Sequence, residues 1–202
     1  MKKLSALALV CSLKPSPHES SSDILVRQVL AEMEKHEVTG EVLRAVDYDI
    51  KPGVETNMGE GDDWPMIREK MLAADILIIA TPTWVGHMSS VAQRIIERLD
   101  AELSETDDEG RLLTYGKVAG AVIVGNEDGA HKITADLYQA LNDVGFTIPA
   151  AGVTYWNGEA MQTTDYKDLK HTPEKVSISM KALAANAVHC ARLLKQNPYP
   201  PS

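Results

Sequence analysis

Apolar residues gather in five short runs along the 202-residue chain, and polar or turn-forming residues separate them. The run at 76–81, Ile-Leu-Ile-Ile-Ala-Thr, is apolar throughout until its last residue. A continuous run of this kind is typical of a strand that is buried on both faces of a parallel sheet. Further apolar runs predict strands at 4–11, 118–124 and 146–150, and alternation of apolar and polar residues predicts one at 41–48.

Helical periodicity fills the intervals between these strands. Behind Ser89 and Ser90, either of which can cap a helix, Val91, Ile95 and Leu99 recur at positions i, i+4 and i+8. The same spacing predicts four further helices: one after residue 22 that ends near Gly40, one capped by Asp63, one at 132–144 and one at 172–196. A long loop, 151–171, and a loose tail, 197–202, complete one domain over residues 1–202.

This alternation of strands and helices predicts an α/β fold. We expect a doubly wound, five-stranded parallel sheet with right-handed crossovers and helices on both faces. Strand order 2-1-3-4-5 suits five strands better than the longer order of dinucleotide-binding domains.

Composition narrows the class of protein. The chain has 20 basic and 29 acidic residues, a formal charge of −9, which argues against binding to nucleic acid. Its two cysteines, Cys11 and Cys190, form no disulfide framework and suggest a cytoplasmic protein with reduced thiols. The N-terminal residues imitate a short signal peptide, but Val10 is not the small residue that processing prefers, so we interpret them as the first strand. No apolar segment is long enough to span a membrane.

Acidic residues cluster between 102 and 109. Glu102, Glu105, Asp107, Asp108 and Glu109 lie in a stretch that we interpret as a solvated connection, because it lacks the spacing and central glycine of a calcium loop. No His or Cys cluster has metal-ligand spacing, so no metal site is predicted.

The loop after the first strand is rich in hydroxyl groups. Ser12, Lys14, Ser20, Ser21 and Ser22 offer donors and a positive charge beside the N-terminus of the first helix. Free N–H groups at a helix N-terminus attract phosphate. The loop is neither a Walker loop nor a Gly-x-Gly-x-x-Gly motif. A serine-rich loop with one capping serine explains it equally well.

The loop after the third strand combines a flat ring with a glycine. Trp84 offers an apolar face, and Gly86 allows close backbone approach. The alternative is an ordinary turn whose tryptophan packs on the surface or against another subunit. We interpret His87 as a loop residue rather than an acid or base, and no catalytic side chain is predicted.

The loop after the fourth strand has glycine at both ends. Gly125, Asn126, Glu127, Asp128 and Gly129 can present backbone N–H and C=O groups to the edge of a heterocycle. The alternative is a helix cap by Asn126 or Asp128. In the predicted strand order all three loops meet at one edge of the sheet, where open α/β sheets bind ligands.

Together these motifs resemble a known family. The segments Cys11-Ser12-Leu13-Lys14, Thr81 to Gly86 and Gly125 to Gly129 are similar to those of NAD(P)H-dependent FMN reductases in the flavodoxin-like superfamily. The resemblance extends over most of 4–156, with Cys11 where many relatives have glycine.

The resemblance implies a flavin site. Ser12, Lys14, Ser20, Ser21 and Ser22 would hold the FMN phosphate; Pro82, Thr83, Trp84, Val85 and Gly86 would wrap the isoalloxazine ring; Asn126, Glu127, Asp128 and Gly129 would line its pyrimidine edge. Tyr155 and Trp156 would cover a ring face, pack on the surface or contact another subunit.

The activity that the resemblance implies is FMN-dependent oxidation of NADH or NADPH, with a quinone, free flavin or similar small molecule as acceptor. Neither nucleic acid nor a membrane is an expected partner, and a homodimer or homotetramer is expected. One alternative is a flavodoxin-type electron carrier without nicotinamide turnover, whose acidic stretch would steer a basic redox partner. Another is an FMN-binding protein without useful turnover.

Overall fold

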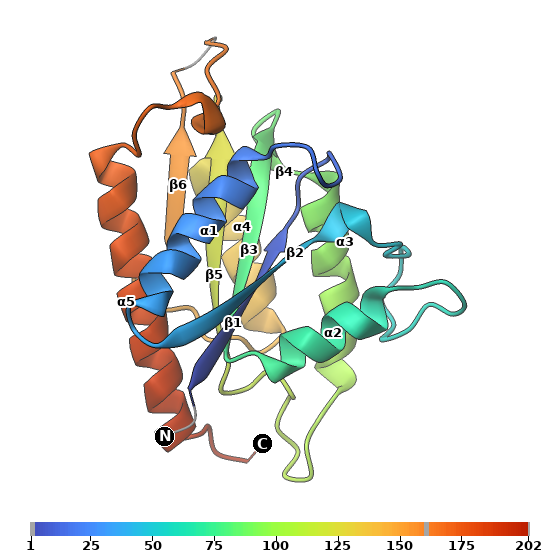
Figure 1. Cartoon of the computed structure of the whole chain (residues 1–202). Coiled ribbons are helices and arrows are strands. Elements are labelled where there is room, and N and C mark those ends of the chain that lie inside the picture. Colours follow the sequence, from blue (N-terminus) through green and yellow to red (C-terminus); the bar gives the residue numbers. More distant parts are fainter. Residues whose placement is uncertain (1–2, 160–161, 202) are drawn as a thin grey trace.

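The computed structural model describes residues 3–159 and 162–201, which form a twisted sheet between two layers of helices (Figure 1). The five parallel strands found in this part of the chain stand in the order β2-β1-β3-β5-β6, which is the predicted 2-1-3-4-5 arrangement. Their bounds are β1 Leu4–Val10, β2 Val38–Arg44, β3 Ile76–Trp84, β5 Val118–Gly125 and β6 Val153–Asn157. A short antiparallel strand, β4 (His87–Met88), pairs with the end of β3.

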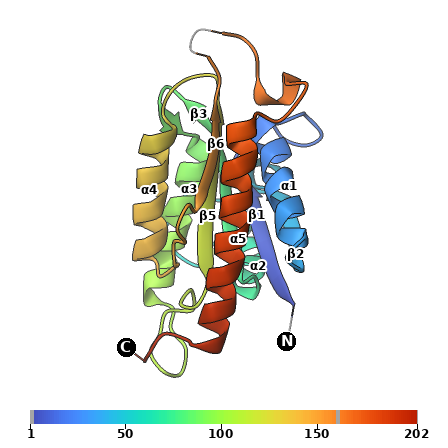
Figure 2. The same ribbon diagram turned by 90° about the vertical axis from the view of Figure 1, so that its left-hand side faces the viewer.

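Helices cover both faces of the sheet, as predicted (Figure 2). On one face lie α1 (Ser21–Glu34) and α5 (Glu174–Gln196), and on the other lie α2 (Trp64–Ala73), α3 (Ser90–Leu99) and α4 (Ala130–Asp143). Because successive strand side chains point to opposite faces, β1 sends Ala8 and Val10 into one core and Leu7 and Leu9 into the other. The fold is therefore a doubly wound α/β sheet.

The strand order reverses between β1 and β3. From β1 the chain crosses to β2 on one side, whereas from β3 it continues to β5 and β6 on the other. The loops that follow β1, β3 and β5 leave the sheet at its carboxyl edge, at the top of Figure 1. This edge is where ligands bind in open α/β sheets.

The second strand was predicted too late in the chain. It begins at Val38 instead of residue 41, and α1 ends at Glu34, so Gly40 lies inside a strand and does not terminate the helix. Glu37 makes the reversal with a positive φ of 64°. A Cβ atom at Gly40 would lie 3.1 Å from the Leu30 side chain, so this glycine lets α1 pack closely on the sheet.

The fifth parallel strand was predicted too early. Residues 146–150 form only one bridge, between Thr147 and Val118, and the strand is β6, inside the long loop expected at 151–171. Pro149 explains the error, because proline donates no ladder hydrogen bond and is disfavoured within a strand.

Strand β3 is longer than predicted and continues through Pro82 to Trp84. The pairing of β1 with β3 ends at Val10 and Ala80, so β1 has ended before Pro82 and no ladder bond is lost on that side. The extension forms a hairpin with β4, in which Trp84 pairs with His87.

The acidic stretch is not a simple solvated connection. Glu102 is fully buried and accepts hydrogen bonds from Arg68 at 2.6 and 3.0 Å, and Glu105 also pairs with Arg68. Asp107 and Glu109 both pair with Arg111. Charge spacing gave no sign of the Arg68 partner, which lies far away in sequence.

The C-terminal tail is docked at Tyr199, whereas a loose tail was expected. The Tyr199 hydroxyl lies 2.9 Å from Thr147 Oγ1, and its ring centroid lies 5.6 Å from that of Tyr115. Among residues 3–159 and 162–201, no helix has the length and apolar character needed to cross a bilayer.

Candidate functional site

A cavity of about 330 Å³ opens at the carboxyl edge of the sheet, beside the reversal between β1 and β3. Three chain segments that the sequence analysis assigned to a ligand site meet in it. The predicted residues that line it are Ser12, Lys14, Ser20, Ser21, Ser22, Pro82, Thr83, Trp84 and Asn126.

One end of the cavity is the N-terminus of α1. Ser20 caps this helix, its Oγ accepting a hydrogen bond from the Asp23 N–H at 3.3 Å, so the capping interpretation holds for one of the serines. Ser12 Oγ donates to the Lys14 carbonyl at 3.1 Å and stabilises the loop. The remaining first-turn N–H groups of a helix are a favourable place for an anion.

The other end is formed by β3 and the start of the β5–α4 loop. Thr83 is 4% exposed and lines the cavity, yet its Oγ1 has no hydrogen-bond partner among the residues that the structure describes. A buried hydroxyl without a partner costs free energy unless a ligand or water satisfies it. Trp84 stands beside it and is half exposed.

Five predicted site residues do not line the cavity, although they lie next to it. The Val85 N–H donates to Glu127 Oε1 at 2.9 Å, and Asp128 Oδ1 accepts from the Gly129 N–H at 2.7 Å. A Cβ atom at Gly129 would lie 2.8 Å from the Gly86 Cα. These residues therefore hold the β3–β4 hairpin against the β5–α4 loop.

Neither Asn126 nor Asp128 caps α4. The N-cap position is Gly129, with a φ of 146° and no side-chain hydrogen bond. Asn126 Nδ2 instead donates to Asp165 Oδ1 at 3.3 Å across the cavity. Asn126 is thus free of the capping role that the sequence left open.

The sequence analysis missed a further wall of the cavity, which consists of Asp165, Tyr166 and Lys167. Trp156, which the sequence analysis had named as able to cover a ring face, lines the cavity beside this wall, and its ring centroid lies 5.7 Å from that of Tyr166 at an interplanar angle of 61°. The three residues lie in the segment expected to be loop. The one available sequence signal was the pair Asp165 and Asp168, which form a reciprocal capping box around the turn η3 (Tyr166–Asp168).

Titratable groups at the site are held in defined states. Burial raises the pKa of the Cys11 thiol to about 12, so it stays protonated and is not a nucleophile near neutral pH. Burial also raises the pKa of Tyr166, which remains a neutral phenol. A hydrogen bond to Asp168 raises the pKa of Lys167, which remains a cation. His87 is exposed on β4 and does not line the cavity.

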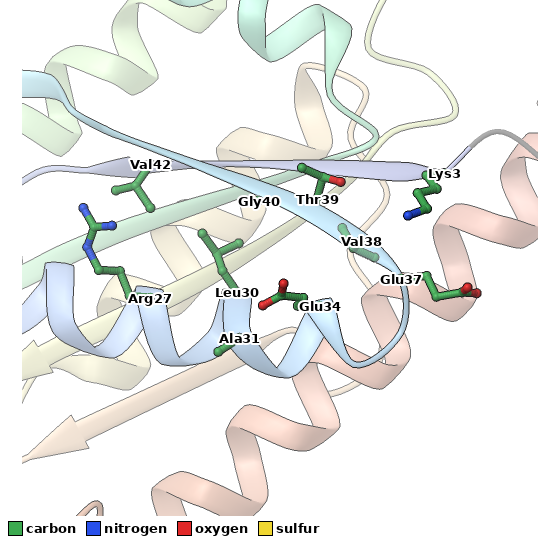
Figure 3. A pocket seen from close by; sticks show the side chains of 10 residues that line it. All are labelled: Lys3, Arg27, Leu30, Ala31, Glu34, Glu37, Val38, Thr39, Gly40 and Val42. Carbon is green, nitrogen blue, oxygen red and sulfur yellow. The ribbon is translucent and has the colours of Figure 1, made fainter.

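A larger hollow, about 600 Å³, lies between α1 and β2 (Figure 3). Its lining mixes charged side chains such as Arg27, Glu34 and Glu37 with apolar ones. It reaches Lys3 and Val38, at the amino ends of β1 and β2, away from the reversal of strand order. In the described part of the chain no group of three or more His, Cys, Asp or Glu side chains could hold a metal ion.

Comparison with known proteins agrees with this geometry. The family model described as NADPH-dependent FMN reductase matches residues 4–160. The chain belongs to this family. Membership in the FMN reductase family supports the assignment of this chain as an FMN-dependent oxidoreductase with a flavodoxin-like fold.

One relative of this family member is a flavin-phosphate enzyme. The 8-demethyl-8-aminoriboflavin-5′-phosphate synthase of Streptomyces davaonensis is 33% identical over 210 residues, which cover 97% of this chain and 80% of that protein. The crystal structure of RosB with bound 8-demethyl-8-formylriboflavin-5′-phosphate, also 33% identical, superimposes with a TM-score of 0.88 over 97% of this chain and 82% of that one.

Other similarities say less about activity. A Mycobacterium bovis protein named divalent metal cation transporter MntH is 36% identical over 95% of this chain, but the chain spans 29% of that protein's length. The apo form of an NADH:FMN oxidoreductase, EMOB, is 19% identical and has a TM-score of 0.62 over 94% of this chain and 89% of that one, which shows the shared fold.

The residues of the cavity fit FMN. The N-terminus of α1, the hydroxyls of Ser21 and Ser22, and Lys14 suit a phosphate group. At the other end Trp84 suits a flat ring, and the unpartnered Thr83 hydroxyl suits a polar atom of a heterocycle.

Proposed function

We propose that this protein is an FMN-dependent oxidoreductase that uses NADH or NADPH as reductant and a quinone, free flavin or similar small molecule as acceptor. The observation that carries the proposal is the cavity beside the β1–β3 reversal, with a phosphate-binding end and an aromatic end. Family membership over residues 4–160 gives independent support.

The chemistry of hydride acceptance and electron transfer is supplied by FMN when it is bound. The chain's own residues bind and orient it: the α1 N-terminus, Ser21 and Lys14 hold the phosphate, and Thr83 and Trp84 contact the ring system. Asn126, at the start of the β5–α4 loop, lines the cavity, and a donor there would favour negative charge at the ring edge. No general acid or base is needed from a side chain.

The cavity has an open entrance that suits a second substrate. Trp84 and Leu13 are both about half exposed at the mouth of the cavity. An apolar rim of this kind favours a planar, weakly polar molecule.

A homodimer or homotetramer is part of the same proposal, and light scattering of the purified protein would measure the assembly.

A flavodoxin-type electron carrier receives less support. That alternative used the acidic stretch as a docking surface for a basic partner, but Glu102 is buried and Glu105 shares its Arg68 partner. Asp107 and Glu109 share the single Arg111. The five acidic residues and the two arginines leave a net charge of −3 there, smaller than the sequence suggested, and the ion pairs give part of the stretch a structural role in place of a free docking surface.

A second candidate function follows from the relative that covers 97% of this chain, a synthase of an amino-substituted flavin phosphate. In that case a flavin phosphate would be the substrate at the same cavity and would leave it chemically altered. The similarity includes residues beyond 160, where the match to the general family model stops.

One experiment tests the proposal. The protein is loaded with FMN and mixed anaerobically with NADH or NADPH, and the visible flavin absorbance is followed. Rapid bleaching, reversed by a quinone, is the expected result. Bleaching that occurs only with a protein electron donor would contradict it and favour the carrier.

The second candidate is separated by analysing the flavin itself. The protein is incubated in air with FMN and an amino-group donor, because exchange of a methyl group for an amino group needs an oxidant and a nitrogen source; the flavin is then released and its mass is measured. Unchanged FMN supports the oxidoreductase, whereas a flavin phosphate of altered mass would support the synthase-like activity.

A further inference from the structure

The wall formed by Asp165, Tyr166 and Lys167 is a feature that family membership does not explain. The match to the family model ends at residue 160, and these three residues come after it. All three nevertheless line the cavity. Part of the cavity wall therefore comes from a segment beyond the region that the family model covers.

This wall is connected to both ends of the cavity. The Lys167 N–H donates to Ser21 Oγ at 3.2 Å, in the first turn of α1. Asp165 Oδ1 accepts from Asn126 Nδ2 at 3.3 Å, in the β5–α4 loop. The three residues thus bridge the phosphate-binding end and the ring-binding end.

Tyr166 fixes the position of this wall. Its hydroxyl donates to Gln28 Oε1 at 2.6 Å and lies 3.4 Å from Thr172 Oγ1. Its ring packs against Trp156, and the residue is only 4% exposed. With Tyr166 buried in this way, its neighbour Lys167 is held beside the start of α1.

The Lys167 ammonium group can exchange its present partner, Asp168, for a ligand. Its side chain is 28% exposed, and its Nζ lies 2.9 Å from Oδ1 of Asp168, whose side chain is 49% exposed. An ion pair with an exposed carboxylate contributes little free energy, so a phosphate group at the helix N-terminus can compete for the ammonium. The other charged groups lining the cavity are Lys14, Glu19 and Asp165, so the two lysines only balance the two carboxylates.

We infer that Lys167 is a second cationic contact, with Lys14, for the 5′-phosphate of the bound flavin nucleotide. This inference rests on the proposed function, since it assigns a residue to the same cofactor. It predicts that Lys167 contributes to the preference for FMN over riboflavin, which has the same ring system and no phosphate.

The test measures binding without turnover. Protein freed of flavin is titrated with FMN and with riboflavin, and quenching of flavin fluorescence gives the two dissociation constants. In Lys167→Met the FMN affinity should fall by about tenfold or more, because a hydrogen bond to a charged group is lost. Riboflavin affinity should stay unchanged, and Lys167→Arg should keep FMN binding.

A matched control uses Lys170→Met, which removes an exposed lysine of the same segment that does not line the cavity. It should leave both affinities unchanged. Salt should weaken FMN binding less in Lys167→Met than in the wild type, because one charge contact is missing.

The outcomes separate this inference from the proposed function. If the wild type binds FMN and Lys167→Met binds it equally well, Lys167 does not contact the phosphate and the inference fails alone. An equal loss of FMN and riboflavin affinity would also overturn it, since the role would then be structural. A wild type that binds neither flavin would overturn both.

Discussion

Val85 is held in a backbone conformation that its own β-branched side chain disfavours. It occupies the tip of the β3–β4 hairpin with a φ of 52°, followed by Gly86 with a φ of 73°. A two-residue hairpin loop with positive φ at both positions favours asparagine and glycine, whereas β-branched residues are strained there. Val85 is 87% exposed, so packing within this chain does not offset the strain.

We therefore expect Val85→Asn to stabilise the protein by about 1 kcal/mol, by relieving left-handed strain. The measurement is the urea midpoint of unfolding at constant m-value. Val54→Asn is a suitable control, because Val54 is also exposed but has no positive φ. An equal shift in both variants would mean that polarity, and not backbone strain, is responsible.

For individual residues, the sequence predicted the kinds of side chain that line the cavity better than it predicted which residues lie outside it. Ser12 and Thr83 were found because they follow predicted strands, whose carboxyl ends meet at one edge of a parallel sheet; Thr83 lies in the last part of β3. Glu127 and Gly129 were assigned to the ligand; the structure places them beside the cavity, where they join two loops. Lys167 had no signal of its own, because its place depends on the burial of Tyr166 far from the other site residues.

Among the elements, the irregular stretch between η1 (Ala45–Asp47) and α2 depends on one buried ion pair. The Arg98 guanidinium, on α3, donates to Asp62 at 2.8 and 2.9 Å and to the carbonyls of Lys51 and Glu55. Both charged side chains are fully buried. The pair therefore attaches a long connection without strands or α-helices to α3.

Asp62→Asn should destabilise the protein by about 3–5 kcal/mol, because it leaves the buried Arg98 charge without a counter-ion. Chemical denaturation at neutral pH measures the change. Asp108→Asn, which alters an exposed acid, should change stability by less than about 0.5 kcal/mol. Equal small effects in the two variants would mean that the Arg98 pair contributes little.

The same pair predicts a dependence on pH. Burial alone would raise the pKa of Asp62, but hydrogen bonds from Arg98 and from the N–H groups of Met58, Trp64 and Lys51 hold it well below its usual value. A depressed pKa in the folded state gives stability that is present above the unfolded-state pKa and is lost as pH falls through the folded-state pKa.

We expect wild-type stability to decline below about pH 4, the ordinary range of an aspartate in an unfolded chain. Asp62→Asn should lose less stability over that interval, since it has no such carboxylate to protonate. Urea midpoints measured at several acidic pH values compare the two proteins. Parallel curves would show that Asp62 is not linked to acid unfolding.

Sequence patterns located the central elements well and the edge strands poorly. The apolar run that begins at Ile76 marks β3, which has a neighbour on each side and must be apolar on both faces. The edge strands β2 and β6 are partly exposed, and their sequences resemble turns more than buried strands do. Their predicted bounds therefore differ from the observed ones. Two residues carried information that would have corrected these bounds. Pro149 argues against a strand at 146–150, and Gly40 indicates close packing of α1 on the sheet.

For the whole molecule, the site ties together segments that are far apart in sequence. Ser21, Thr83, Asn126 and Lys167 line one cavity, so a ligand that contacts them all links the β1, β3 and β5 ends to the turn η3. Binding only to the folded state stabilises it by about 2.7 kcal/mol at a ligand concentration one hundred times Kd.

We expect FMN to slow amide hydrogen exchange in β6 and η3 as well as in the loop after β1. Helix α2 contributes no residue to the cavity and serves as an internal control with little change. Exchange followed by mass spectrometry, with and without FMN, measures both. Protection confined to the loop after β1 would mean that η3 takes no part in binding.

Because η3 follows the other walls of the cavity in the sequence, it also has a consequence in time. During synthesis the ribosome releases the segments around Ser12, Thr83 and Asn126 well before Lys167. A nascent chain can fold its central strands and still lack the last wall of the cavity. Firm retention of FMN would then begin only after β6 and η3 have emerged, so cofactor content would report how completely each newly made molecule has folded.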